Sequence, residues 1–158
     1  MRTPFHRTEV SMSHQSATRV FNVGSNVVQD CARILAMGYQ YFDINVLDTS
    51  RSESDKWDER NRYGWNDLIQ PSFLKSTDVV IIGHPSWKTR VGSVAVGTSL
   101  VAQLRSLGFV GLLMAGSRDS EADDRLLAAG AYAIARPAQL EMQIKSLVET
   151  LRATGPRV

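Results

Sequence analysis

The chain has a single cysteine, no long apolar run and almost no excess of charge of either sign, and each absence excludes a class of protein. Cys31 cannot form a disulfide within the chain, and its apolar position in a predicted helix favours a packed thiol over a nucleophile. No segment reaches the ~18–20 apolar residues that span a bilayer, and the N-terminus lacks the apolar block of a signal peptide. We therefore expect a cytoplasmic protein that makes no membrane contact.

The charged residues nearly balance and are scattered along the chain. There are 18 Lys and Arg against 16 Asp and Glu, so the net charge is only +2. A domain that binds nucleic acid normally concentrates basic residues on one face, and this pattern argues against nucleic-acid binding by the domain itself. A length of 158 residues with 43% hydrophobic residues is typical of one globular domain with a single core.

Residues 1–17 are predicted to form a flexible leader, because they mix Thr, Ser, His, Arg and Pro without apolar periodicity. Residues 18–154 are predicted to form one domain, in which short apolar strands alternate with helices. Strands that are apolar throughout are covered on both faces, so the pattern predicts a parallel five-stranded sheet with helices on both faces. The expected strands are 19–23, 39–47, 78–82, 110–114 and 132–135, and the expected helices are 26–37, 65–74, 94–106, 120–129 and 139–153.

A polar insertion at about residues 48–66 is longer than a simple connection between a strand and a helix. Loops above ~12–15 residues without structure of their own are usually functional. Trp57 and Trp65 lie in this insertion and are candidates for anchoring a protein partner. The alternative is that both tryptophans pack against the edge of their own domain, where large aromatic side chains usually lie.

The carboxyl ends of the strands are where an open parallel sheet binds its ligands, and they carry little chemistry here. His84 follows a strand, but no partnered carboxylate or nucleophile-elbow spacing accompanies it, so we expect a hydrogen-bonded loop histidine. A small hydrolase that uses His84 and Ser86 is the third and weakest hypothesis. The acidic residues at 119–124 suit the start of a helix better than a metal cluster. We expect no enzyme, no cofactor and no metal.

The second half of the chain resembles the response-regulator receiver family. The strand at 78–82 is followed by a loop that contains proline, and a helix ends in the sequence Leu-Arg-Ser-Leu-Gly at 104–108. The most specific part is the run 128–137, which is similar to the family's Ala-Gly-Ala, aromatic, apolar strand and Lys-Pro signature. The resemblance covers about residues 19–152. It implies a flavodoxin-like, CheY-like fold with strand order 2-1-3-4-5.

The reactive residues of that family are missing from this chain. In receivers an acidic pair after the first strand binds Mg²⁺, an aspartate after the third accepts phosphate, a Thr or Ser after the fourth senses it, and a Lys before proline pairs with it. None of the corresponding residues carries the required group, because Mg²⁺ needs carboxylate oxygens and arginine is not equivalent to lysine. The resemblance thus implies a degenerate phosphorylation pocket made of Gly24, Ser25, Gly83, His84, Ala115 and Arg136.

The resemblance implies a pseudo-receiver, an atypical two-component signalling domain that acts by protein–protein interaction and independently of phosphorylation. Its partner would be a kinase, a regulator or an output domain, or a second copy of the chain. The implied contact surface comprises residues 118–125, Tyr132 and residues 139–151. The alternative is a ligand-responsive module, in which a small anion or metabolite occupies the vacated phosphorylation pocket and Arg136 binds the anion.

Overall fold

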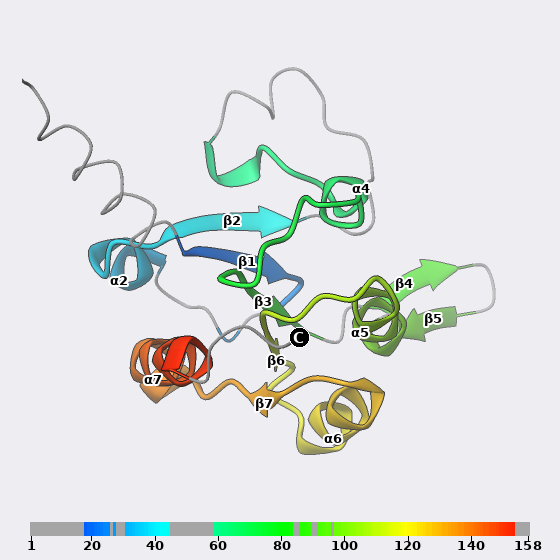
Figure 1. Ribbon diagram of the computed structural model, residues 1–158. Helices are drawn as coiled ribbons and strands as arrows, with labels where there is room; N and C mark the ends of the chain where they lie inside the picture. The colour runs from blue at the N-terminus through cyan, green and yellow to red at the C-terminus, as the bar shows by residue number, and fades with distance from the viewer. Residues whose placement is uncertain are drawn as a thin grey trace, which may run out of the picture.

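The computed structural model describes residues 18–25, 27, 31–44, 59–83, 86–89, 92–95 and 97–153. Its centre is a parallel sheet in the order β2-β1-β3-β6-β7 (Figure 1). Counted along the chain, these strands have the order 2-1-3-4-5, so the predicted flavodoxin-like, CheY-like fold is confirmed. The strands are β1 (Arg19–Val23), β2 (Gln40–Ile44), β3 (Val79–Ile82), β6 (Leu112–Ala115) and β7 (Ala133–Ile134).

Helices cover both faces of the sheet, and the strand residues alternate between the two layers (Figure 1). Phe21 and Val80 belong to the apolar cluster under α4, α5 and α6, while Val20 belongs to the cluster under α2 and α7. This alternation is the period of two that a strand imposes on its side chains. The helices are α2 (Cys31–Ala36), α4 (Trp65–Leu68), α5 (Gly97–Ser106), α6 (Ser120–Ala129) and α7 (Leu140–Ala153), with 3₁₀ turns η1 (Glu59–Asn61) and η2 (Pro137–Gln139).

An antiparallel hairpin follows β3, and the sequence analysis did not predict it. Its strands are β4 (Ser86–Thr89) and β5 (Gly92–Ala95), which pair separately from the main sheet. The prediction that a helix begins at Val94 was therefore wrong, because α5 begins at Gly97. The segment holds β-branched residues beside small ones, which favours extended backbone. Those local preferences outweighed the apparent helical periodicity.

The other predicted elements differ from the structure mainly at their ends. The helix predicted for 65–74 is only the short α4, and turns follow it. By contrast, α6 has the predicted bounds. The predicted leader and residues 48–58 of the predicted insertion lie outside the described residues. Within the described part of the chain, no helix has both the length and the apolar character needed to cross a membrane.

A buried ion pair joins β1 to the segment before β3, at the amino edge of the sheet. Arg19 donates from Nε and Nη2 to the two carboxylate oxygens of Asp78, at 3.0 and 2.7 Å, and from Nη2 to the carbonyl of Phe73 at 2.7 Å. Asp78 also accepts from the backbone N–H of Lys75 at 2.7 Å. Its side chain is only 1% exposed, so removal of Arg19 would leave a buried charge without its cation.

A second arginine joins two helix ends. Arg105, near the end of α5, donates from Nε to the carbonyl of Gly130 at 2.8 Å and from Nη1 to the carbonyl of Phe109 at 2.7 Å. Burial lowers the pKa of the Arg105 guanidinium from its usual value. These bonds connect the end of α5 to the end of α6 and to the segment before β6.

Candidate functional site

The carboxyl ends of β1, β3 and β6 lie level with one another in the centre of the sheet. Val23 pairs with Ile82, and Ile82 pairs with Ala115. The residue that follows each of these three strands is a glycine. The backbone N–H of Gly83 donates to the carbonyl of Val23 at 3.0 Å, and that of Gly116 donates to the carbonyl of Ile82 at 2.8 Å. The hydrogen-bonded sheet therefore continues through the place where the resemblance implies a reactive pocket.

There is no room for a side chain at two of these glycines. A Cβ on Gly83 would clash with the carbonyl oxygen of Gly24 and would lie 2.9 Å from the Cα of Ser25. A Cβ on Gly116 would lie 2.6 Å from Ser25 Oγ and 2.9 Å from a methyl group of Ile81. Because the obstacle at Gly83 is backbone, it cannot turn away as the end of a flexible side chain could. The position where the resemblance implies an acceptor aspartate therefore holds a glycine with no space for a side chain.

The hydroxyl of Ser25 fills part of the space between the strand ends. Ser25 is buried and donates from Oγ to the carbonyl of Gly116 at 2.6 Å, while Oγ accepts from the backbone N–H of Val27 at 3.1 Å. Asn22 holds the same turn, since its Nδ2 donates to the Ser25 carbonyl and its Oδ1 accepts from the Ser25 N–H, both at 2.9 Å. Ser25 thus joins the end of β1 to the end of β6, and its hydroxyl both donates and accepts within this turn.

The register corrects one predicted member of the pocket. Ala115 is fully buried inside β6 and packs in the core cluster with Val23 and Ile82. Gly116 occupies the level of Gly83 instead. The sequence could not distinguish the two positions, because the apolar run at 112–116 contains no polar residue that marks where the strand ends. His84 lies outside the described residues, and its predicted role stays a prediction.

Arg136 does not lie against the closed strand ends. Its side chain is exposed and lines a hollow of about 470 Å³ between the β6–α6 connection and the β7–α7 connection. Its backbone N–H donates to Gln143 Oε1 at 2.7 Å, and Gln143 Nε2 donates in turn to the carbonyl of Ile134 at 2.8 Å. The proposed single pocket is therefore divided into a closed region at β1, β3 and β6 and an open hollow beside β7.

The predicted partner-binding residues have different environments. Trp65 is 6% exposed, packs in the core and donates from Nε1 to Gln103 Oε1 at 3.2 Å. Its predicted role as an exposed anchor is therefore wrong, and the alternative of packing on its own domain is correct. Tyr132 is 53% exposed at the start of β7, the edge strand. Trp57 lies outside the described residues.

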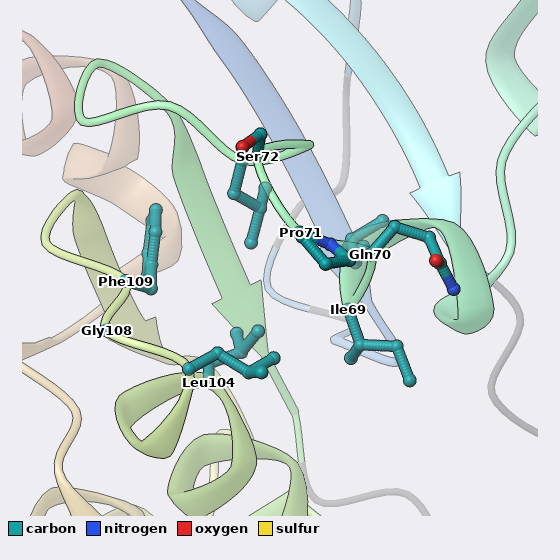
Figure 2. A pocket seen from close by; sticks show the side chains of 10 residues that line it. Ile69, Gln70, Pro71, Ser72, Leu104, Gly108 and Phe109 are labelled. Atoms are coloured by element: carbon teal, nitrogen blue, oxygen red, sulfur yellow. The ribbon is translucent and has the colours of Figure 1, made fainter.

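A second hollow lies among the segments that precede β3 and β6, and its lining is mainly apolar. It measures about 280 Å³ and lies between the segment after α4 and the end of α5. Figure 2 shows Ile69, Pro71, Leu104 and Phe109 around it, with Gln70 and Ser72 as polar neighbours. Among the described residues that line this hollow, none has a charged side chain. In the described part of the chain, no three His, Cys, Asp or Glu side chains are placed to share a metal ion.

Several residues shape these sites in ways that the sequence alone did not indicate. Asn22 is a polar residue within an apolar strand, and that exception was a signal that its side chain is hydrogen-bonded. The sequence predicts that the fourth strand ends at Ala115 and Gly116, and the register of β6 shows that Gly116 lies beside Gly83. Arg118 has a φ of 65°, which is unusual for a residue with a side chain, and no sequence pattern indicated it.

No protein-family model matches the chain, and no curated protein matches it. Among solved structures, the chain is similar to the signal receiver domain of a modulated diguanylate cyclase from Desulfovibrio desulfuricans G20, described as an example of alternate folding. The sequences are 11% identical, the TM-score is 0.48, and the similarity covers 87% of this chain and 98% of that domain. The fold assignment rests on this chain's own strand order and helix layers.

Proposed function

We propose that this chain is a receiver-like regulatory domain that acts through protein contacts and is not phosphorylated at the end of its third strand. The observation that supports this most is the contact between the ends of β1 and β3, where a Cβ on Gly83 would fall on the carbonyl oxygen of Gly24. Phosphoryl transfer to a side chain needs a nucleophilic oxygen in line with the donor. Gly83 has no such oxygen, and its surroundings leave no place for one.

The surroundings of Gly83 also do not suit a divalent cation. Mg²⁺ prefers carboxylate and water oxygens in near-octahedral geometry. Gly24 and Ser25 supply no carboxylate, and the Ser25 hydroxyl is bonded to the Gly116 carbonyl and the Val27 N–H. The proposal therefore includes no metal-dependent step and no catalysis. The same close packing argues against the alternative of a ligand held between the ends of β1, β3 and β6.

The edge formed by α6, β7 and α7 is the surface that best suits a protein partner. β7 has only two residues and is the last strand of the sheet (Figure 1). Tyr132 is 53% exposed before this strand, and Met142 is 74% exposed on α7. Exposed tyrosine is enriched among residues that dominate binding energy, and methionine adapts to varied apolar partners. We assign this edge to a kinase, a regulator or an output domain, or to a second copy of the chain.

Two measurements test the proposal. Incubation with acetyl phosphate and Mg²⁺, followed by intact-mass analysis, is expected to leave the protein unmodified, and stoichiometric formation of an acyl phosphate would contradict the proposal. A Tyr132→Ser, Met142→Ser double variant is expected to release a partner identified by cross-linking, or to shift a dimer to monomer in sedimentation equilibrium. Leu35→Ser is the matched control. Leu35 is an exposed apolar residue, at 51%, but it lies on α2 and so outside the proposed contact surface. If both variants lost the partner equally, the proposal that α6, β7 and α7 form the contact surface would be contradicted.

A further inference from the structure

The hollow beside β7 has two walls that come from neighbouring strand ends. The connection between β6 and α6 supplies Arg118 and Ser120, and the connection between β7 and α7 supplies Arg136 and Gln139. Ile134 and Ala135, at the end of β7, also line it. Its volume of about 470 Å³ lies within the ~300–1,000 Å³ of pockets that bind small molecules. Its position at the carboxyl ends of parallel strands is where open α/β sheets bind ligands.

The guanidinium groups of Arg118 and Arg136 line this hollow, and neither has an ion pair or hydrogen bond to a described residue. The other arginines whose side chains the structure describes each have such a contact or a neighbouring aromatic ring. Arg33 and Arg125 lie near carboxylates, and Arg105 donates to two carbonyl groups. No ion pair or hydrogen bond engages the side chain of Arg118 or Arg136 within the described part of the chain. Two guanidinium groups that border one hollow are suited to an anion, because each presents a planar fork of donors to phosphate or carboxylate oxygens.

The wall that carries Arg118 is held in place by an internal network. Asp123 is 5% exposed, and its Oδ1 accepts from the backbone N–H of Ser117 at 2.9 Å and from Ser117 Oγ at 2.6 Å. This carboxylate is therefore already hydrogen-bonded within its own loop. The network fixes the residue before Arg118, whose φ of 65° is unfavourable for a side-chain-bearing residue. Asp119 caps α6 by accepting from the N–H of Glu121, so an anion here would be held by guanidinium groups and not by the helix end.

The opposite wall is fixed in a similar way. The amide of Gln143 bridges the backbone N–H of Arg136 and the carbonyl of Ile134, which holds the corner between β7 and η2. Fixed walls lower the entropy that a ligand must lose on binding. The site is thus preorganised on both sides, with a cation from each wall, apolar atoms from β7, and the Asp123 carboxylate, which lines the hollow but is hydrogen-bonded to Ser117.

We propose that the hollow between the β6–α6 and β7–α7 connections binds a small phosphate monoester, held by Arg118 and Arg136. A phosphate dianion matches two guanidinium groups in charge, and its three terminal oxygens can accept from two forks of donors together. The hydroxyl of Ser120 and the amide of Gln139 add neutral donors, and the apolar atoms of Ile134 and Ala135 face the organic part of the ligand. This inference goes beyond the proposed function and does not depend on it.

Isothermal titration calorimetry of the full chain with AMP, inorganic phosphate and adenosine tests the site. We expect saturable binding of AMP, weaker binding of inorganic phosphate and none of adenosine. Arg118→Asn, which keeps a residue that tolerates positive φ, and Arg136→Gln should each weaken AMP binding at least about tenfold, equivalent to about 1.4 kcal/mol. Arg125→Gln is the matched control, because Arg125 lies on α6 and does not line the hollow, and it should change nothing. Thermal melts confirm that each variant is folded.

Three results would overturn the inference: no saturable binding of AMP or phosphate at millimolar concentration, AMP binding that both Arg118→Asn and Arg136→Gln leave unchanged, or equal weakening by all three arginine variants. The last result would mean that general positive charge attracts the ligand. Failure here is distinct from failure of the proposed function, since partner contact and acyl phosphate formation are measured without AMP. If the chain binds its protein partner but no phosphate monoester, only the inference of a ligand site fails and the proposed function stands.

Discussion

An aspartate introduced at Gly83 should unfold the domain and should not accept a phosphoryl group. A Cβ at this position would fall on the Gly24 carbonyl oxygen, and both the Gly24 carbonyl carbon and the Ser25 Cα would lie under 3.0 Å from it, at 2.8 and 2.9 Å. The backbone of β1 would therefore have to move away from β3. That movement would strain the hydrogen bond from the Gly83 N–H to the carbonyl of Val23, which closes the sheet at this end.

The size of the effect follows from packing. Gly83→Ala adds one methyl group to a filled space, which costs about 1–3 kcal/mol. For a domain of this length each kcal/mol lowers Tm by about 2–4 °C, so we expect a fall of roughly 2–12 °C. Gly83→Asp adds a carboxylate beside which no described residue places a cation, for a further penalty of several kcal/mol. The sum approaches the whole stability of a typical domain, about 5–15 kcal/mol.

Thermal and urea unfolding followed by circular dichroism measure these losses, and Gly108 is the matched control. Gly108 has a φ of +85° with no atom within 4 Å of an added Cβ, so only its backbone conformation resists substitution. Asparagine tolerates positive φ better than alanine does. At Gly108, the Asn variant should be more stable than the Ala variant. At Gly83 the order of stability should reverse, so that the Ala variant is more stable than the Asn variant. The reason is that the larger asparagine side chain clashes more extensively with the Gly24 carbonyl.

A Gly83→Ala protein with the Tm of the parent chain would refute the reasoning, because it would show that β1 and β3 separate freely at their ends. A folded Gly83→Asp protein labelled by acetyl phosphate and Mg²⁺ would be the stronger contradiction. It would mean that the scaffold retains an open acceptor site and lacks only the aspartate. The proposal of a closed, phosphorylation-independent domain would then fall.

Three further predictions concern contacts around the same sheet. Ser25→Ala removes the bond to the Gly116 carbonyl and should lower the free energy of unfolding by about 1–3 kcal/mol. Gly116→Ala should destabilise the Ser25→Ala protein less than it destabilises the parent chain, by ~0.5–3 kcal/mol in a double-mutant cycle. The reason is that a Cβ on Gly116 would lie 2.6 Å from Ser25 Oγ. Arg19→Ala should cost about 3–5 kcal/mol in urea unfolding, since it leaves Asp78 buried without its cation, and Arg19→Lys should recover only part of this. Trp65→Ala should cost about 3–5 kcal/mol in the same assay as a core truncation, and a change within about 0.5 kcal/mol would instead indicate a surface residue.

The outcome for individual elements shows which predictions depend on short-range chemistry. The bounds of α6 were predicted correctly because both ends carry local signals: Asp119 caps the first turn, and Gly130 ends the helix with a φ of 132°. The hairpin of β4 and β5 was missed, because a short segment of β-branched and small residues also fits the start of a helix. Its pairing joins residues on separate strands, and no single local pattern marks such a pair.

The candidate site was only partly predictable, for the same reason. The absence of acidic residues at Gly24, Ser25 and Gly83 is visible in the sequence. That the backbone closes over their position is not visible, because the closure depends on the approach of β1 to β3. Trp65 was open to two interpretations until its burial against α5 decided between them.

By itself, the order of residues determined an alternating series of apolar strands and helices, the sheet class that such a series builds, and the absence of acidic side chains at Gly24, Ser25 and Gly83. Those features depend on hydrophobic periodicity, helix capping and residue identity, which act within a few positions of the chain. Only the tertiary structure decided that Gly116 and not Ala115 lies beside Gly83, and that Arg118 and Arg136 face one hollow. Strand register and the meeting of separate loops arise from long-range packing of the whole sheet, and no local segment carries that information.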